Sequence, residues 1–182
     1  GRTLPVATGI HLANHALKVV ATAGDGDCYG EGGNHLLAAL RKNPDLTLVV
    51  HNNQIYALTN GQASPTTDQG YKTLLQPHGV PYPPLHALAI AVAQDCSWLG
   101  RGFAGRGEHL TGLYKQALTH TGFALLEVLQ PCVSFNKVNT FPWYEKRVYD
   151  VEAEPDFDPE NELWAYQKAK EWGDRIPIGV IS

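Results

Sequence analysis

Two short polar segments of the sequence have the residue types of a site for a divalent cation and a diphosphate. The first is the acidic turn Gly24-Asp25-Gly26-Asp27, and the second is Asn53, which lies 28 residues after Asp25. Asp25 offers an anionic oxygen, Asn53 a neutral amide oxygen, and the backbone carbonyl of Ile55 a third ligand. Mg²⁺ prefers such hard oxygen ligands, and phosphate oxygens and water complete its octahedron. The combination of Asp25 with Asn53 therefore predicts a bound cation that links the chain to a diphosphate.

The glycines of the turn explain how a diphosphate could approach the backbone. Gly24 and Gly26 allow a tight turn and a close approach to the phosphates. Free N–H groups of the turn and of the following helix would meet the negative charge. Each segment alone has a plain structural explanation, since Gly-Asp-Gly is a common turn and Asn-Asn a common strand end. Their combination at two strand ends indicates a binding site.

Hydrophobic periodicity places both segments at the ends of strands. Residues 18–23 and 46–50 have the pattern of buried strands, with a helix over about residues 32–41 between them. A strand–helix–strand unit implies parallel pairing and a right-handed crossover. In open parallel sheets, ligands bind beyond the carboxyl ends of the strands. If the two strands are neighbours, Asp25 and Asn53 face the same crevice.

The remaining pattern completes an α/β fold, a mostly parallel sheet flanked by helices with an irregular C-terminal tail. The further expected elements are helices over residues 6–17, 85–93, 107–119 and about 159–172, strands over 97–103 and 123–129, and a Pro-rich loop over 58–84. We expect one domain over residues 1–182. Residues 1–133 would form the core sheet and helices, and residues 134–182 an extension that packs on the core or on a partner.

Composition narrows the class of protein. The 182 residues are 43% hydrophobic and 18% charged, as in a globular domain with a sizeable core. The apolar runs are too short for a transmembrane helix, and the net charge of -4 suggests no nucleic-acid groove. Three scattered Cys suit a reducing cytoplasm. The chain starts at Gly1 and contains no Met, so we expect a piece that lacks its natural start.

Several segments of the sequence match a known family. They are residues 1–9, 24–27, 32–35, 53–59, 61–66, 129–132, 135–139 and 172–179. With Gly24-Asp25-Gly26 and Asn52-Asn53 as a thiamine diphosphate signature, the chain resembles the beta subunit of 2-oxoacid:ferredoxin oxidoreductases over nearly its whole length. The resemblance implies oxidative decarboxylation of a 2-oxoacid to an acyl-CoA, with two electrons passed singly to ferredoxin.

The resemblance also implies roles for individual residues. It assigns Mg²⁺ to Asp25, Asn53 and the carbonyl of Ile55. The residues that it implies for binding thiamine diphosphate are Gly24, Gly26, Asp27, Ala57, Leu58 and Thr59. Residues 59–67 are similar to the active-site loop of the family. Asn60 stands where family members often have Lys or Gly, and this departure bears on substrate preference, so 2-oxoglutarate, pyruvate and branched-chain acids all stay open.

The family's beta subunit binds one 4Fe–4S cluster through three cysteines of an N-terminal segment and the Cys of Leu-Gln-Pro-Cys. Cys132 matches that fourth position. A four-thiolate cluster cannot form on Cys132 alone, so the resemblance implies a cluster only in a full-length parent. From its residue type alone, we interpret Cys132 as a small residue of the core. Cys28 and Cys96 match no ligand position, and we interpret both as packing residues.

No carboxylate at a strand end is placed to activate the thiamine ring, so no catalytic residue is assigned to this chain. In thiamine diphosphate enzymes that Glu comes from a separate pyrimidine-binding domain. We therefore expect an alpha subunit that carries it, with the cofactor at the interface and the isolated chain inactive. Arg101 and Arg106 are candidates for CoA phosphates or a substrate carboxylate, although an ion-paired surface is the simpler interpretation.

Two other functions stay open at this point. The first is half of a non-oxidative thiamine diphosphate-dependent decarboxylase or carboligase. The segments Gln130-Pro131-Cys132 and 61–66 speak against it. The second is a non-catalytic assembly domain in which Gly-Asp-Gly is only a turn.

Overall fold

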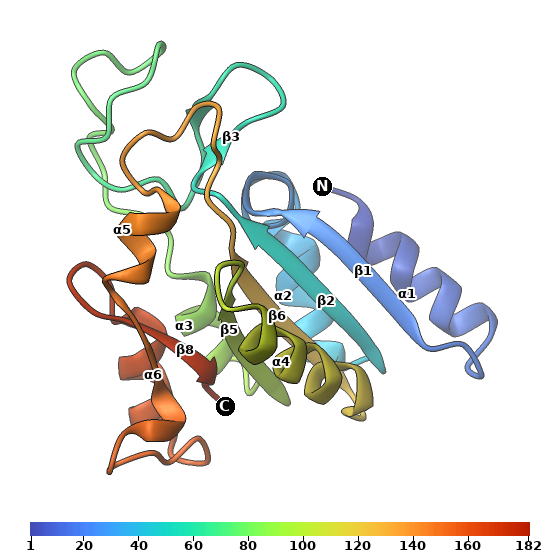
Figure 1. Cartoon of the computed structure of the whole chain (residues 1–182). Helices are drawn as coiled ribbons and strands as arrows, with labels where there is room; N and C mark the ends of the chain where they lie inside the picture. The colour runs from blue at the N-terminus through green and yellow to red at the C-terminus, as the bar shows by residue number, and fades with distance from the viewer.

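A six-stranded sheet forms the centre of the molecule (Figure 1). The structure, a computed structural model, describes residues 1–182. The strands lie in the order β1-β2-β6-β5-β8-β7. Their bounds are β1 Val19–Gly24, β2 Leu46–Asn52, β5 Trp98–Phe103, β6 Phe123–Leu129, β7 Val148–Asp150 and β8 Ile176–Val180. All neighbours pair in parallel except β5 and β8, so the sheet is mostly parallel, as expected.

Helices cover both faces of this sheet. They are α1 Thr3–Ala13, α2 Gly33–Lys42, α3 Ala87–Val92, α4 Gly107–Thr119, α5 Phe141–Glu145 and α6 Glu162–Lys170. Leu46, Leu48 and Val50 of β2 belong to the main apolar core, with residues of α1, α2, α3 and α6. Val49 belongs instead to the cluster beneath α4. The alternation follows from the two-residue period of a strand, and burial on both faces explains why β2 reads as a continuous apolar run.

The first helix is shifted from its expected bounds of residues 6–17. It begins at Thr3, because Pro5 lies in the first turn, where a missing N–H costs no helical hydrogen bond. It ends at Ala13, because Asn14 has an extended backbone and its side chain accepts a hydrogen bond from the Ala16 N–H at 3.0 Å. No helix of the chain is both long enough and apolar enough to cross a lipid bilayer.

The C-terminal tail is more regular than the sequence predicted. The expected helix is present as α6, but residues 134–182 also form α5, β7, the short helix η2 Val151–Ala153 and β8. The sequence did not predict β7, because a strand of three residues shows no clear period. It did not predict β8, because Pro177 and Gly179 interrupt the apolar pattern. A third apolar cluster packs this tail on the sheet; it consists of Phe103, Leu129, Tyr144, Val148, Ile176 and Ile178.

The long loop after β2 also contains some regular structure. A two-stranded antiparallel ribbon pairs β3 Ile55–Tyr56 with β4 Gln62–Ala63. The rest, up to α3, is irregular, in agreement with its proline content. Figure 1 shows this loop and the segment after β6 gathered beyond the carboxyl ends of β2 and β6. Any site at that edge is therefore built mainly by loops.

Candidate functional site

The structure brings Asp25 and Asn53 together at the carboxyl edge of the sheet. β1 and β2 are parallel neighbours, with Gly24 opposite His51, so the two strands end side by side. Asp25 follows β1 directly and precedes the π-helix η1, Gly26–Glu31. The backbone N–H of Asn53 points at Asp25 Oδ1 with an N···O distance of 3.5 Å. The two segments that the sequence singled out therefore converge.

Asp25 is a buried carboxylate without a cationic partner. Its exposed fraction is 1%, and it takes part in none of the ion pairs of the chain. Oδ2 accepts hydrogen bonds from Ser64 Oγ at 2.5 Å and from Thr66 Oγ1 at 2.6 Å. Burial raises the pKa of Asp25, and the bonds from Ser64, Thr66 and the Asn53 N–H offset part of that rise. A bound cation would neutralise this charge.

Gln54 bends the chain between Asn53 and Ile55. Its φ of +58° lies in the left-handed region, which costs a non-glycine residue about 1–2 kcal/mol. Hydrogen bonds hold it there, because its N–H donates to Asn52 Oδ1 at 3.1 Å and its Oε1 accepts from the Tyr144 hydroxyl at 2.6 Å. Beside the bend, the Ile55 N–H donates to Asn53 Oδ1 at 3.0 Å, which fixes the direction of that amide.

The two glycines of the turn have different surroundings. A Cβ on Gly24 would meet nothing within 4 Å, so the chain there is open to a ligand. A Cβ on Gly26 would clash with the ring of Tyr56, and the Tyr56 hydroxyl donates to the Gly26 carbonyl at 3.2 Å. Close packing against Tyr56 is therefore a reason for glycine at position 26 that the sequence did not reveal.

The other residues expected at the diphosphate lie in η1 and in the connection between β3 and β4. Asp27 is half-buried, and its Oδ2 accepts a hydrogen bond from Thr3 Oγ1 at 3.2 Å, which directs the side chain toward α1. Ala57, Leu58 and Thr59 form the tip between β3 and β4. The side chain of Leu58 is fully exposed at 101%, so the chain itself leaves this apolar surface uncovered.

Cys132 lies at the same edge of the sheet. It is partly exposed and lines an open pocket of about 420 Å³ together with Asn53 and His51. Cys28 and Cys96 are buried, and burial raises the pKa of each thiol to about 12. Such thiols stay protonated at neutral pH, in agreement with packing roles.

The two arginines that the sequence marked differ in environment. Arg106 is exposed and pairs with Glu145 at 2.6 Å, as a surface residue would. The expectation of a surface role is wrong for Arg101, which is 4% exposed. Arg101 Nε donates to Glu127 Oε2 at 3.0 Å, and Glu127 is equally buried. Both side chains come from adjacent strands of the sheet, where they face each other in register.

Sequence reasoning missed several residues that shape this edge. Ser64 and Thr66 were noticed only as part of a similar segment, and nothing in the sequence showed that their hydroxyls reach Asp25. Glu127 had a clearer signal, because it is the one charged residue of the buried strand Phe123–Leu129. A lone charge in such a strand needs a partner.

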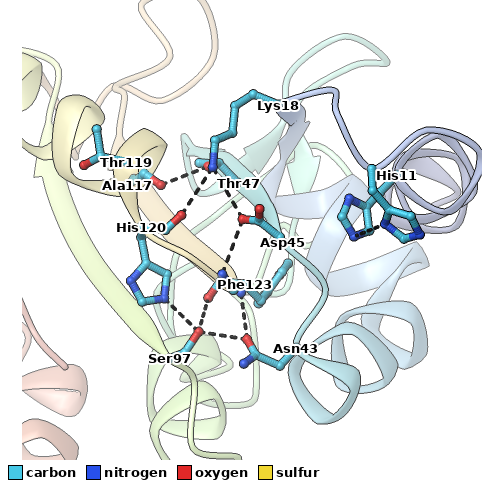
Figure 2. A network of polar contacts seen from close by, with 12 residues as sticks. His11, Lys18, Asn43, Asp45, Thr47, Ser97, Ala117, Thr119, His120 and Phe123 are labelled. Carbon is cyan, nitrogen blue, oxygen red and sulfur yellow. Dashed lines mark hydrogen bonds and ion pairs between the residues drawn. The ribbon is translucent and has the colours of Figure 1, made fainter.

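The opposite edge of the sheet has a polar network of another kind (Figure 2). Lys18 pairs with Asp45 at 3.4 Å, and Asn43 Oδ1 accepts from Ser97 Oγ at 2.8 Å and from the Phe123 N–H at 2.7 Å. These bonds join the loops that precede strands. They have a structural explanation, and they lie at the far end of the strands from Asp25.

Two sequence families match the chain. The family described as "Thiamine pyrophosphate enzyme, C-terminal TPP binding domain" matches residues 1–128. The family that describes the C-terminal part of the pyruvate ferredoxin oxidoreductase beta subunit matches residues 132–182. Together they cover almost all of the chain, and the boundary between them falls after β6.

Individual relatives agree with these matches. A 2-oxoacid:ferredoxin oxidoreductase subunit beta from a Sulfolobus species is 42% identical over all of this chain, and one from Saccharolobus solfataricus is 41% identical. The chain spans 62% of the length of each of these curated relatives. A solved 2-oxoglutarate:ferredoxin oxidoreductase from Magnetococcus marinus, with 2-oxoglutarate, coenzyme A and succinyl-CoA bound, superposes with a TM-score of 0.93. The two sequences are 34% identical. The superposition includes 99% of this chain and 61% of the Magnetococcus marinus chain.

Proposed function

The chain belongs to the thiamine pyrophosphate enzymes and, within them, to the beta subunits of 2-oxoacid:ferredoxin oxidoreductases, and from this premise we propose its reaction. The proposed reaction is Mg²⁺- and thiamine diphosphate-dependent oxidative decarboxylation of a 2-oxoacid to an acyl-CoA, with the electrons delivered to ferredoxin. The observation that carries the proposal is the meeting of Asp25 and Asn53 at the ends of two adjacent parallel strands.

The residues at this edge fit a magnesium diphosphate. Asp25 is a buried carboxylate whose nearest polar partners are hydroxyl and N–H donors, so a cation is the missing counter-charge. Because Ser64 and Thr66 hold Oδ2, the proposed ligand is Oδ1, next to the Asn53 segment. The amide oxygen of Asn53 and the carbonyl of Ile55 complete the protein ligands. The open side of Gly24 gives the diphosphate room.

The remaining residues would orient the cofactor. Gly26, Asp27, Ala57 and Thr59 are proposed to border the diphosphate, and the exposed side chain of Leu58 offers an apolar contact. When bound, thiamine diphosphate supplies the nucleophile for the 2-oxo carbon and the electron sink for decarboxylation. The chain's own contribution is to bind the cofactor and to neutralise its diphosphate through the metal.

Three further parts of the proposal concern what joins this chain. The Glu that activates the thiamine ring is proposed to come from an alpha subunit, with the cofactor between the two subunits. Cys132 is proposed as one thiolate ligand of a 4Fe–4S cluster in a longer parent chain, since it lines the same open pocket as Asn53 and the cluster would face the proposed cofactor site. CoA, a 2-oxoacid and ferredoxin are the proposed substrates and acceptor.

Calorimetry tests the proposed site. The native beta subunit, assembled with its alpha partner, is titrated with thiamine diphosphate in the presence of Mg²⁺. We expect Asp25→Ala to abolish binding and CoA-dependent reduction of a low-potential dye. Asp45→Ala, at the opposite edge of the sheet (Figure 2), is the matched control and should bind as the wild type does. Undiminished cofactor binding by Asp25→Ala would contradict the proposal.

A further inference from the structure

A single buried carboxylate, Glu127, contacts both segments that carry the proposed metal ligands. Its exposed fraction is 3%. Oε1 accepts a hydrogen bond from the Tyr29 hydroxyl at 3.1 Å and another from Asn52 Nδ2 at 3.1 Å. Oε2 accepts from Arg101 Nε at 3.0 Å. Glu127 lies on β6, and β2 separates β6 from β1, so it reaches the turn after β1 only through the long side chain of Tyr29.

Tyr29 and Asn52 each lie close in sequence to a proposed metal ligand. Tyr29 lies in η1, the helix that begins directly after Asp25. Asn52 is the last residue of β2 and directly precedes Asn53. One oxygen atom therefore ties the segment of Asp25 to the segment of Asn53. Thr66 Oγ1 lies 2.9 Å from Asn52 Oδ1 and 2.6 Å from Asp25 Oδ2, so its single O–H is shared between the two residues.

The protonation states support a rigid connection. Burial first, and then the charge of Glu127, raise the pKa of Tyr29 well above its usual value, so the hydroxyl stays a donor. The two oxygens of the Glu127 carboxyl group have enough lone pairs to accept the three bonds observed. Arg101 supplies the counter-charge and is itself anchored by Nη2, which donates to the Ala169 carbonyl at 2.9 Å. The three hydrogen bonds to Glu127 are all buried, and buried bonds of this kind restrict the motion of the groups that they join, although Arg101 Nη1 has no partner.

A buried ion pair gives little stability by itself, because desolvation of both charges offsets their attraction. Stability is thus a poor explanation for a charge in the middle of β6. We propose that Glu127 is a positioning residue of the metal site, which fixes the separation of Asp25 from Asn53 through Tyr29 and Asn52. The inference rests on the proposed function of the site and extends it to residues that do not touch the metal.

The positioning role of Glu127 predicts an effect on the selectivity of the site for Mg²⁺ over other metal ions. Mg²⁺ demands near-ideal octahedral geometry with ligands at about 2.0–2.1 Å, whereas Ca²⁺ accepts irregular geometry at about 2.3–2.6 Å. If Glu127 fixes the spacing of the ligands, a variant that loses its hydrogen bonds should have a less precise spacing. Its affinity for Mg²⁺ should then fall more than its affinity for Ca²⁺. A purely structural role would lower the melting temperature and leave the ratio of the two affinities unchanged.

The test compares Mg²⁺ and Ca²⁺ affinities in the presence of thiamine diphosphate, by calorimetry on the assembled complex. Tyr29→Phe removes one hydroxyl and no volume of consequence, and Glu127→Gln removes the charge. We expect each to weaken Mg²⁺ binding about 10-fold or more, the usual scale for outer-shell partners of metal ligands, and Ca²⁺ binding by much less. Tyr114→Phe is the matched control, because Tyr114 lies on α4 and packs in the apolar cluster beneath that helix.

The outcomes separate the two proposals. An unchanged ratio of Mg²⁺ to Ca²⁺ affinity in Tyr29→Phe overturns the role of Glu127, even if the melting temperature falls. A wild-type complex that binds neither metal together with thiamine diphosphate overturns the proposed function, and the role of Glu127 with it. If Glu127→Gln fails to assemble because Arg101 is left unpaired, Tyr29→Phe decides alone.

Discussion

The burial of Asp25 makes the stability of the fold depend on pH. Because the pKa of Asp25 is raised in the folded state, the folded state binds this proton more tightly than the unfolded state does. The stability linked to the proton is fully present below the unfolded pKa and is lost as the pH rises through the raised folded pKa. In the absence of metal, the ionised carboxylate therefore destabilises the fold at neutral pH.

Asp25→Asn should relieve this cost, because an amide keeps the shape and still accepts hydrogen bonds from Ser64 and Thr66. We expect a melting temperature of the metal-free protein that is a few degrees higher than in the wild type, with a difference that grows with pH. Thermal unfolding at about pH 5 and about pH 8 measures it. Asp45→Asn is the control for charge removal at an exposed ion pair. A variant less stable than the metal-free wild type at both pH values would refute this account.

The sequence predicted which two segments meet at this edge of the sheet, but not which side chains surround them. Asp25 and Asn53 were found because two neighbouring strands end where their residue types change from apolar to polar. Ser64, Thr66 and Gln54 could not be placed, because a loop has no periodicity that tells where its hydroxyls point. The bend at Gln54 was also hidden, since a non-glycine residue gives no local sign of a positive φ.

Among the secondary-structure elements, the π-helix η1 and the ribbon β3–β4 pack closely where Tyr56 meets the glycines of η1. The ring of Tyr56 in β3 lies over Gly26, the first residue of η1. We expect Gly26→Ala to lower the free energy of unfolding by about 1–3 kcal/mol, because the added methyl group overpacks this contact. Urea unfolding measures the change. Gly33→Ala, where a Cβ meets nothing within 4 Å at the start of α2, should be neutral or slightly stabilising.

A second variant shows whether Tyr56 is the cause. Combining Gly26→Ala with Tyr56→Ala removes the ring that the methyl group would strike. The pair should then be less destabilising than the sum of the two single changes. Simple additivity would mean that Gly26 is needed for its backbone and not for its contact with Tyr56.

Elements with strong periodicity were predicted closely, and short ones were not. The bounds of α4 and β6 agree with the expected residues 107–119 and 123–129. β7 was missed because three residues cannot show a two-residue period, and β8 because Pro177 and Gly179 disguise it. Both take their places from the apolar cluster that they share with Phe103 and Leu129, which is a property of the folded molecule.

The C-terminal extension, residues 134–182, contacts the candidate site at the carboxyl ends of the strands. We propose that residues 1–133 and 134–182 form one structural unit, because β8 pairs with β5 and the extension contributes to a shared apolar cluster. The extension also reaches the carboxyl edge through Tyr144 of α5. This side chain is 1% exposed, and its hydroxyl donates to Gln54 Oε1 at 2.6 Å. Gln54 is the residue between the proposed metal ligands Asn53 and Ile55.

Tyr144→Phe removes this bond and leaves the buried oxygen of Gln54 without its donor. An unsatisfied buried acceptor costs about 1–3 kcal/mol, and for a chain of this size each kcal/mol lowers the melting temperature by about 2–4 °C. Tyr166→Phe is the control, because Tyr166 is 40% exposed and should change stability by less than about 0.5 kcal/mol. Since the same bond holds the left-handed bend of Gln54, the loss should also weaken Mg²⁺ binding in the complex. A variant with lower stability and unaltered Mg²⁺ affinity would show that the extension supports the fold without shaping the site.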